Sequence, residues 1–351
     1  MVRVKVIWRS VGTVRESVDA VGRLGEQAGQ EPSLIFEFDG CQFICDADCQ
    51  DYDWLVVYDE VPRNVGTVKD ECEELACPRE HTILVTIEPP TIKVYPKCYS
   101  NQFAYLLTTH TQEQLPHPRH RYGEGCLQWC ADCTLEELFS MPEYEKTCEL
   151  GTVCSAKQQT HTLHRMRYNL TKYLSEHLPQ MDWYGRGVKP LSRKCDALFP
   201  YRYHVAMENY IAPYHWTDKI SDPILGLCLT FYAGDPRLSE IFPADSFIPI
   251  PADNPPEACR IISEAIANNE YEKRLSAIKE ARRLLIEKYN FYAQVAALIH
   301  EVEAGEKEPP ARVPFKLKGR HRLRRNPINA LAEAWEILRC RYYVKKNRCK
   351  N

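Results

Sequence analysis

The segment 201–236 limits the fold of this chain more than any other stretch. It opens with a run of apolar and aromatic residues, 203–207, that predicts a buried strand. The polar pair Glu208 and Asn209 follows, and then come an aromatic loop, a helix-like stretch and a second apolar run, 225–232. Strand, polar loop, helix and strand make up half of a nucleotide-binding α/β unit, in which ligands bind beyond the carboxyl ends of the strands. We therefore expect these polar residues to lie where a nucleotide diphosphate binds.

The same segment carries a motif with specific spacing. A Glu-Asn pair, an aromatic loop, a Thr-Asp-Lys triplet and an apolar strand that ends in Gly-Asp-Pro occupy residues 208–236. This order resembles the donor-binding motif of the α-1,3/1,4-fucosyltransferase family, which is family 10 of the glycosyltransferases. The resemblance continues through residues 242–248 and includes residues 154–157 and 164–167 upstream. It is thinner before residue 155 and absent beyond residue 300.

The resemblance implies an α/β protein of the GT-B class, in which two Rossmann-like domains face each other across a cleft. Apolar runs at 2–8, 34–38, 54–58 and 82–86 predict strands of a parallel sheet, and 14–25 predicts a helix. We expect an N-terminal acceptor-binding domain over residues 1–151 and a nucleotide-sugar donor-binding domain over residues 152–300. A basic tail with an amphipathic helix, residues 301–351, completes the expected organisation.

The composition indicates a soluble globular protein. The chain has 351 residues, a net charge of −3 and 44% hydrophobic residues. Golgi members of the family carry an N-terminal membrane anchor, whereas residues 1–8 alternate apolar and charged side chains as a strand does. We expect a bacterial-type, cytoplasmic enzyme with peripheral contact to the inner face of the membrane.

The sixteen cysteines are scattered, which favours reduced thiols in a cytosolic protein over a disulfide framework. One cluster, Cys126-x3-Cys130-x2-Cys133, has the spacing with which radical S-adenosylmethionine enzymes hold an iron–sulfur cluster. That motif normally follows the first strand of a barrel, and no pattern of eight βα units follows it here. A radical enzyme is therefore a remote alternative.

The transfer of a sugar from a nucleotide diphosphate requires positive charge at the leaving diphosphate. The resemblance implies that Arg167 and Lys219 supply it, with Arg165 as the alternative to Arg167. It also implies that Asn209 contacts the donor and that Asp218, a glutamate in the family, contacts the ribose or the sugar. The remaining predicted donor-binding residues are Ser155, Glu208, Tyr214, His215 and Thr217. For Glu208, a structural role that closes the loop is an equal alternative.

An inverting transfer also requires a base for the acceptor hydroxyl. The resemblance implies Glu88, which follows a predicted strand and precedes two prolines. Asp59, Glu60 and Glu208 are the competing candidates. No Asp-x-Asp pair stands at a strand end of the second domain, so we expect neither a metal nor a cofactor to be required.

The expected function is the inverting transfer of fucose from GDP-fucose to a hydroxyl of a glycan acceptor, such as the lipid-linked glycan of a lipopolysaccharide. One alternative is a related transferase that uses another GDP-sugar, because His215 and Asp218 depart from the family pattern. Another is a non-catalytic protein that binds sugar nucleotides or glycans. Donor hydrolysis in the absence of acceptor separates an enzyme from such a binder.

The tail has a strong basic bias, with 13 Lys or Arg and two Glu in residues 311–351. Five apolar residues recur at helical spacing, 3, 4, 3 and 4 apart: Ile328, Leu331, Trp335, Leu338 and Tyr342. A basic amphipathic helix is typical of a membrane-surface element. The alternative is a helix that packs on its own domain and leaves the basic residues in solvent. No nucleic-acid partner is expected.

Overall fold

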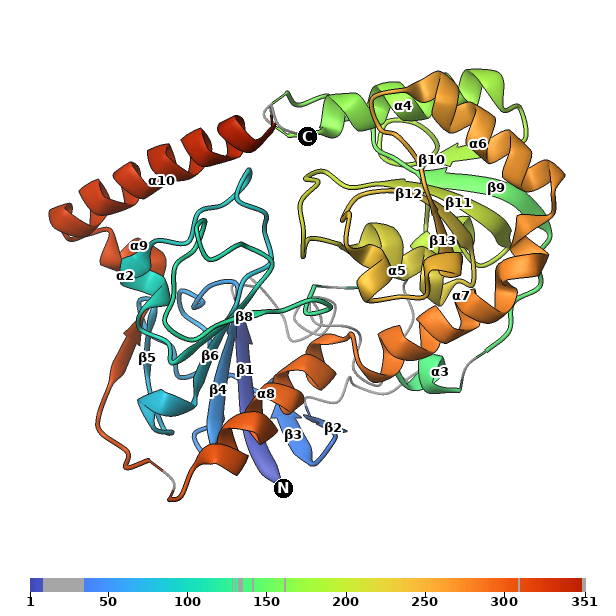
Figure 1. Cartoon of the computed structure of the whole chain (residues 1–351). Helices are drawn as coiled ribbons and strands as arrows, with labels where there is room; N and C mark the ends of the chain where they lie inside the picture. The colour runs from blue at the N-terminus through green and yellow to red at the C-terminus, as the bar shows by residue number, and fades with distance from the viewer. Residues whose placement is uncertain are drawn as a thin grey trace. The chain divides into compact units, whose positions relative to one another are not determined.

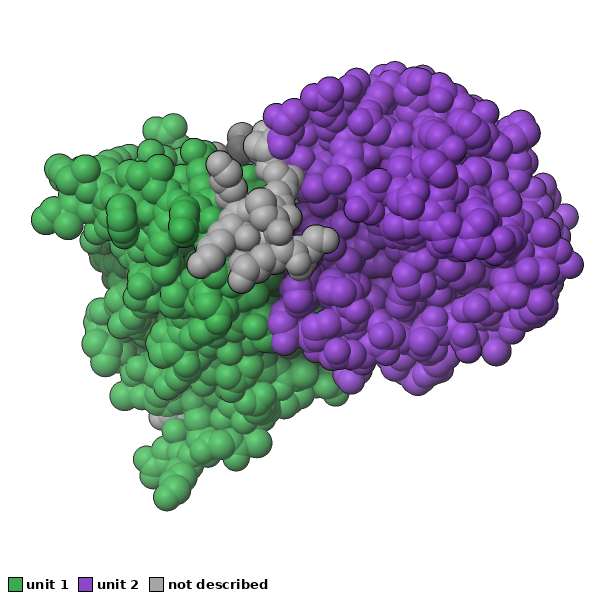
Figure 2. Space-filling model, turned by 45° about the horizontal axis from the view of Figure 1, so that its top comes forward, with its two compact units in different colours: residues 1–126, 290–351 green, residues 127–289 purple. Residues whose placement is uncertain are grey.

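The computed structural model describes residues 1–8, 35–127, 129, 131, 135–140, 142–160, 162–308 and 310–348. The chain forms two compact units (Figure 2). Unit 1 contains residues 1–126 and 290–351, and unit 2 contains residues 127–289. The chain therefore passes from unit 1 to unit 2 between residues 126 and 127 and returns between residues 289 and 290. The predicted domain boundaries were between residues 151 and 152 and between residues 300 and 301.

Unit 1 is built on a seven-stranded sheet with the order β2-β3-β1-β4-β6-β7-β8 (Figure 1). The strands are β1 (Val2–Trp8), β2 (Ile35–Phe38), β3 (Cys41–Ile44), β4 (Trp54–Tyr58), β6 (Thr82–Val85), β7 (Tyr105–Thr108) and β8 (His120–Tyr122). All neighbouring pairs are parallel except β2 and β3. Every residue of β4 and β6 is buried, as expected for a parallel sheet covered on both faces. The four predicted strands of this region are confirmed.

Strand β3 is not among the predicted strands. Asp39 and Gly40 join β2 to β3 in a tight turn, with φ of 45° and 73°. An Asp-Gly pair between two apolar runs is a sequence signal for such a hairpin. The predicted helix over 14–25 lies outside the described residues, as do Cys130 and Cys133 of the cysteine cluster.

The C-terminal segment belongs to unit 1. It contains α8 (Phe291–Gly305), β14 (Lys316–Lys318), α9 (Arg320–Leu323) and α10 (Pro327–Arg348). Helix α8 places Tyr292 against Phe43 of β3, with ring centroids 4.9 Å apart. Strand β14 pairs with β5 (Cys72–Glu74) and inserts the fully buried Leu317 into the core of unit 1. These apolar contacts explain why residues 290–300 leave the predicted donor domain and why part of the predicted tail is integral to unit 1.

Helix α10 packs through Glu333 and Cys340, which are 1% and 3% exposed. Glu333 accepts hydrogen bonds from the guanidinium of Arg320 at 2.5 and 2.8 Å. The five apolar residues at helical spacing lie on the other face and are 60–75% exposed. The helix thus packs through its polar face, and not through its apolar face.

Unit 2 contains a five-stranded, fully parallel sheet with the order β10-β9-β11-β12-β13. The strands are β9 (Cys148–Val153), β10 (Met181–Tyr184), β11 (Tyr201–Met207), β12 (Leu229–Ala233) and β13 (Phe247–Pro249). The helices are α3 (Leu135–Phe139), α4 (His164–His177), α5 (Asp218–Leu225), α6 (Pro255–Ala267) and α7 (Glu270–Glu287). Numbered within the unit, the strand order is 2-1-3-4-5, which is a doubly wound order of nucleotide-binding folds. The predicted α/β class with two Rossmann-like domains is confirmed in each unit.

Strand β9 contains Gly151, which interrupts its apolar pattern. A Cβ at this position would lie 3.0 Å from the ring of Tyr201 on the neighbouring strand, so glycine permits the close packing. Among the described residues, no helix is long and apolar enough to cross a membrane.

Candidate functional site

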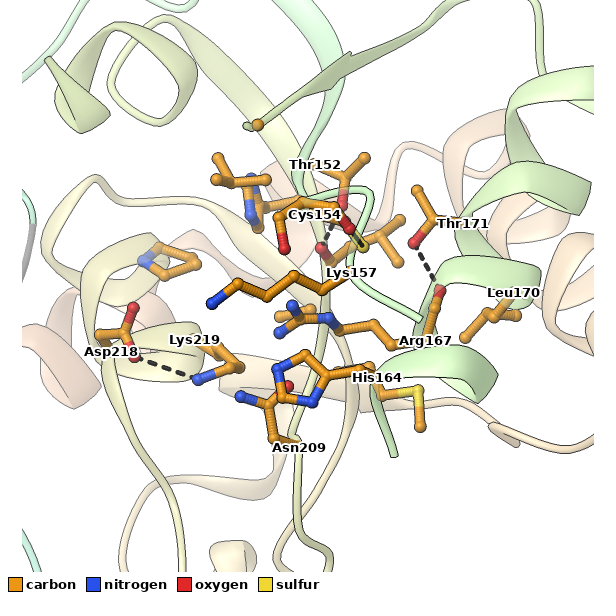
Figure 3. A pocket seen from close by; sticks show the side chains of 18 of the residues that line it. Thr152, Cys154, Lys157, His164, Arg167, Leu170, Thr171, Asn209, Asp218 and Lys219 are labelled. Carbon is orange, nitrogen blue, oxygen red and sulfur yellow. Dashed lines mark hydrogen bonds and ion pairs between the residues drawn. The ribbon is translucent and has the colours of Figure 1, made fainter. Parts of the chain in front are cut away.

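A cavity of about 360 Å³ lies at the carboxyl end of the sheet of unit 2 (Figure 3). Residues 152–154 at the end of β9 and residues 204–207 of β11 form part of its wall. The strand order reverses between β9 and β11, since β10 follows β9 in sequence but lies on its other side. Ligands of doubly wound sheets bind at this switch point. The topology alone therefore marks this cavity as a candidate nucleotide site.

The structure brings five of the predicted donor-binding residues together around this cavity. They are Ser155, Arg167, Asn209, Asp218 and Lys219. Glu208, Tyr214, His215 and Thr217 do not line it. Arg165 is exposed on α4 and does not line it either, so the helix geometry selects Arg167 from the two arginines.

Five further residues of the cavity wall with lysine, arginine or histidine side chains were not predicted: Lys157, His164, Arg186, Lys194 and His204. Arg186 follows β10 and Gly185, so the rule that ligands lie at strand ends was a usable signal for it. Lys157 and His164 lie within the stretches that carry the family resemblance. Lys194 comes from a short 3-10 helix, Lys194–Ala197, and no sequence pattern marks it.

The start of helix α5 positions Asp218 and Lys219. Thr217 caps the helix, and its side chain accepts a hydrogen bond from the Lys219 amide. The Lys219 ammonium lies 3.2 Å from an Asp218 carboxylate oxygen and 3.6 Å from the Glu208 carboxylate. Burial lowers the pKa of Lys219, but these two carboxylates outweigh burial and raise it above its ordinary value. Lys219 is therefore a charged ammonium at neutral pH.

Lys194 joins two acidic residues of the same helix. Its ammonium lies 2.6 Å from carboxylate oxygens of both Asp218 and Asp222. Burial raises the pKa of Asp218, but Lys194 and Lys219 outweigh burial and hold it well below its usual range. Asp218 thus presents a carboxylate, held from two sides, at the cavity wall.

Glu208 lies beneath this helix start and is fully buried. Its carboxylate accepts hydrogen bonds from the amide and hydroxyl of Thr217 at 2.9–3.0 Å, and from the hydroxyl of Tyr232 at 3.3 Å. Burial raises the pKa of Glu208 despite these partners and Lys219. The contacts favour the structural role for Glu208, which closes the loop before α5.

Arg167 and Asn209 have polar atoms without partners. Arg167 is only 9% exposed, and its Nε makes no hydrogen bond among the described residues. The buried Oδ1 of Asn209 likewise has no partner within this part of the chain. Both residues line the cavity, and the side chain of Arg167 points into it (Figure 3). Buried polar groups are normally hydrogen-bonded, so these atoms indicate a ligand that supplies the missing bonds.

A separate set of acids follows the strands of unit 1. Glu88 lies three residues after β6, where its amide donates a hydrogen bond to the Tyr95 hydroxyl oxygen at 3.4 Å and its carbonyl oxygen lies 2.8 Å from His110 Nε2. Lys93 forms ion pairs of 2.7 Å with both Asp59 and Glu60. Asp59 and Glu60, two of the competing acids, are therefore engaged in ion pairs. The backbone of Glu88 is held by its contacts with Tyr95 and His110.

Asp235 supports the loop that precedes α5, and its titration gives a testable pH effect. It is buried, and desolvation raises its pKa from 3.8 to about 6. The folded chain keeps this proton up to about pH 6, whereas the unfolded chain loses it near 3.8, so stability falls as pH rises through this window. Asparagine cannot ionise. We therefore expect the free energy of unfolding of Asp235→Asn to fall by on the order of 1 kcal/mol less than that of wild type over this pH window.

Urea unfolding at several pH values between 4 and 8 measures this effect. The expected result is a stability difference between Asp235→Asn and wild type that grows in favour of the variant from pH 4 to 7. Asp253→Asn, a change at an exposed carboxyl, is the matched control. Parallel pH curves for wild type and Asp235→Asn would contradict the expectation.

Comparisons with known proteins return structures only. No family model matches the chain, and no curated protein matches it significantly. A crystal structure of an α1,3-fucosyltransferase is 14% identical, with a TM-score of 0.47 over 89% of this chain and 93% of that chain. A structure of an α1,3-fucosyltransferase with GDP-fucose is 13% identical, with a TM-score of 0.45 over 84% and 90% of the two chains.

A sucrose-phosphate synthase from Thermosynechococcus elongatus is 9% identical, with a TM-score of 0.42 over 87% of this chain and 100% of that chain. All three TM-scores are below 0.5. The functional argument therefore rests on the cavity of unit 2 and its residues.

Proposed function

We propose that this protein is an inverting glycosyltransferase that transfers fucose from GDP-fucose to a hydroxyl of a glycan. The observation that carries the proposal is the cavity at the switch point of unit 2. Arg167, Asn209, Asp218 and Lys219 of the donor motif converge there from α4, the end of β11 and α5. A doubly wound sheet with cations at its switch point suits a nucleoside diphosphate.

In this proposal Arg167 and Lys219 neutralise the charge that develops on the departing diphosphate. An arginine offers a planar fork to phosphate oxygens, and a lysine offers a point charge. Fixed cations in a partly buried cavity stabilise such a leaving group without reorganisation during the reaction. Because these side chains provide the positive charge, we expect donor binding to need no metal ion.

Glu88 is the proposed base. Its carboxylate takes the proton of the acceptor hydroxyl, and the hydroxyl oxygen bonds to the anomeric carbon of the donor sugar. The bond between that carbon and the β-phosphate oxygen breaks, and its electron pair leaves with GDP. Attack on the face opposite the leaving group inverts the configuration at the anomeric carbon. Asp59 and Glu60, two of the competing candidates, both form ion pairs with Lys93.

Isothermal titration calorimetry with GDP and UDP tests the nucleotide assignment. We expect GDP to bind at least about tenfold more tightly than UDP, a difference of about 1.4 kcal/mol. GMP, which lacks the second phosphate, is the control for the diphosphate contribution and should bind more weakly than GDP. Equal affinities for UDP and GDP would remove the GDP-sugar assignment while leaving a nucleotide-sugar site.

Helix α10 supports the proposal that the enzyme contacts an anionic membrane surface. Its five apolar residues are 60–75% exposed, and the segment 311–351 carries 13 Lys or Arg. Apolar side chains enter the interface of a bilayer, and basic side chains attract its anionic headgroups. Contact of this kind would bring the enzyme to a lipid-linked glycan acceptor.

Co-sedimentation with phosphatidylglycerol vesicles measures this contact. A variant with Trp335→Ser and Leu338→Ser should lose about tenfold or more in vesicle affinity, because two large exposed apolar groups are removed. Val313→Ser is the control, since Val313 is 68% exposed in the same segment but lies outside α10. Truncation before Leu317 is unsuitable, because it would remove a core residue of unit 1. Unchanged sedimentation of the double variant would contradict membrane contact through α10.

A further inference from the structure

The cations of the cavity fall into two sets. Lys194 and Lys219 belong to the first set, and both are already paired with acids. Lys194 contacts Asp218 and Asp222, each at 2.6 Å, and Lys219 contacts Asp218 at 3.2 Å and Glu208 at 3.6 Å. Two ammonium groups therefore face three carboxylates. This part of the wall positions Asp218 and Lys219, and its carboxylates offset much of the positive charge of the two ammonium groups.

The second set consists of Lys157, Arg167 and Arg186. All three line the cavity, and none has a carboxylate partner among the described residues. The surplus positive charge of the cavity therefore resides in these three side chains. Of these three residues, only Arg167 was predicted to bind the donor.

Lys157 has an exposed side chain, and the backbone just before it is fixed by hydrogen bonds. The loop after β9 is hydrogen-bonded to the turn after β10, from Cys154 N to Tyr184 O at 2.8 Å and from Ala156 N to Arg186 O at 2.9 Å. The turn fits closely beneath the loop, because a Cβ on Gly185 would lie 2.5 Å from the carbonyl oxygen of Cys154. The side chains of Lys157 and Arg167 both extend into the cavity (Figure 3). The two loops thus form a built wall that presents Lys157 to a ligand.

The charge of the ligand changes during the proposed reaction. A diphosphate bonded to a nucleoside and a sugar carries two negative charges. After transfer, the terminal phosphate is a monoester with a second pKa of about 6, so the released diphosphate carries close to three negative charges at pH 7.5. Three unpaired cations match the product more closely than the donor. Lys157 and Arg186 are exposed and Arg167 is nearly buried, and a point charge within a few ångströms of the phosphates distinguishes these two ligands by their difference in charge.

We propose that Lys157 is a third cation of the diphosphate site and that it makes the cavity hold the released nucleoside diphosphate more tightly than the intact sugar nucleotide. This inference rests on the proposed use of a GDP-sugar. It assigns Lys157 a ligand contact that selects between product and donor by charge. A consequence is strong inhibition by the released diphosphate.

The test is calorimetry at pH 7.5 with GDP and with GDP-fucose, using wild type, Lys157→Gln, Lys157→Arg and Lys172→Gln. Lys157→Gln should weaken GDP binding roughly tenfold or more and GDP-fucose binding by about threefold or less. Lys157→Arg should retain both affinities within about threefold, because the charge is kept. Lys172 lies exposed on α4 away from the cavity, so Lys172→Gln should change neither.

Two results would overturn the inference and leave the proposed function intact. One is GDP binding by Lys157→Gln within twofold of wild type, which would place Lys157 outside the site. The other is equal weakening of GDP and GDP-fucose, which would remove the selection by charge. If wild type binds neither ligand but binds UDP, the proposed function fails. The same comparison with UDP and UDP-glucose then decides the role of Lys157.

Discussion

Replacement of Glu88 by glutamine should lower the rate of glycosyl transfer by roughly 10²–10⁴-fold, the usual range for loss of a general base. Glutamine keeps the shape and polarity of the side chain but cannot accept the proton of the acceptor hydroxyl. GDP affinity should stay unchanged, because the proposed nucleotide site is formed by residues of unit 2. Transfer rates at saturating donor and acceptor, together with calorimetry of GDP, measure both quantities.

Glu37→Gln is the matched control for this variant, because Glu37 is an exposed acid on the edge strand β2 of the same unit. The control should transfer at the wild-type rate. Retention of more than about a tenth of the wild-type rate by Glu88→Gln would contradict the assignment. Asp59, Glu60 and Glu208 would then have to be replaced in turn.

Replacement of Arg167 by alanine should weaken GDP binding by about 1.5–3 kcal/mol, the scale of a charge-assisted hydrogen bond. Arg167 is nearly buried, and its Nε has no hydrogen-bond partner among the described residues. The variant therefore removes a ligand contact and breaks no ion pair of the folded chain that the structure records. Calorimetry gives the affinity, and a melting curve checks that the variant is folded.

Arg165→Ala is the control, because Arg165 lies two residues earlier on α4 and does not line the cavity. It should bind GDP within about twofold of wild type. If Arg167→Ala and Arg165→Ala lost equal GDP affinity, the loss would reflect the overall charge of the protein. Arg167 would then not be assigned to the site.

Lys219 differs from Arg167 because it forms an ion pair with a buried carboxylate of the protein. Lys219→Ala should cost a similar 1.5–3 kcal/mol in GDP binding. It should also lower the melting temperature, because it leaves the buried Glu208 without its ammonium partner. Lys219 thus combines a structural role with its proposed contact to phosphate.

The fold was predictable from the sequence where local patterns decide it. The apolar runs of β1, β4, β6 and β11 are long enough to be recognised as strands, and Thr217 is a strong helix cap. The return of the chain to unit 1 at residue 290 was not predictable. It depends on the packing of Tyr292 on Phe43 and on the insertion of Leu317 from a three-residue strand. Contacts between residues so far apart in sequence leave no local pattern.

The candidate site was predictable where residues follow a motif. Arg167, Asn209, Asp218 and Lys219 come from stretches that resemble a known family, and all four line the cavity. The motif did not reveal which of its members face the ligand, because Glu208 and Thr217 bond to each other beneath the helix start. Lys194 lies outside any motif, and its place in the cavity wall and its ion pairs with two acids of α5 identify it.

The most direct test of the proposed function is a donor panel read by released nucleotide. The purified protein is incubated with GDP-fucose, GDP-mannose, UDP-glucose and UDP-galactose, each with and without a mixture of glycan acceptors. The account predicts that GDP is released from GDP-fucose faster than any nucleotide from the other donors, and that acceptor increases this rate. Release from UDP-sugars alone, or release from none of the donors, would contradict it.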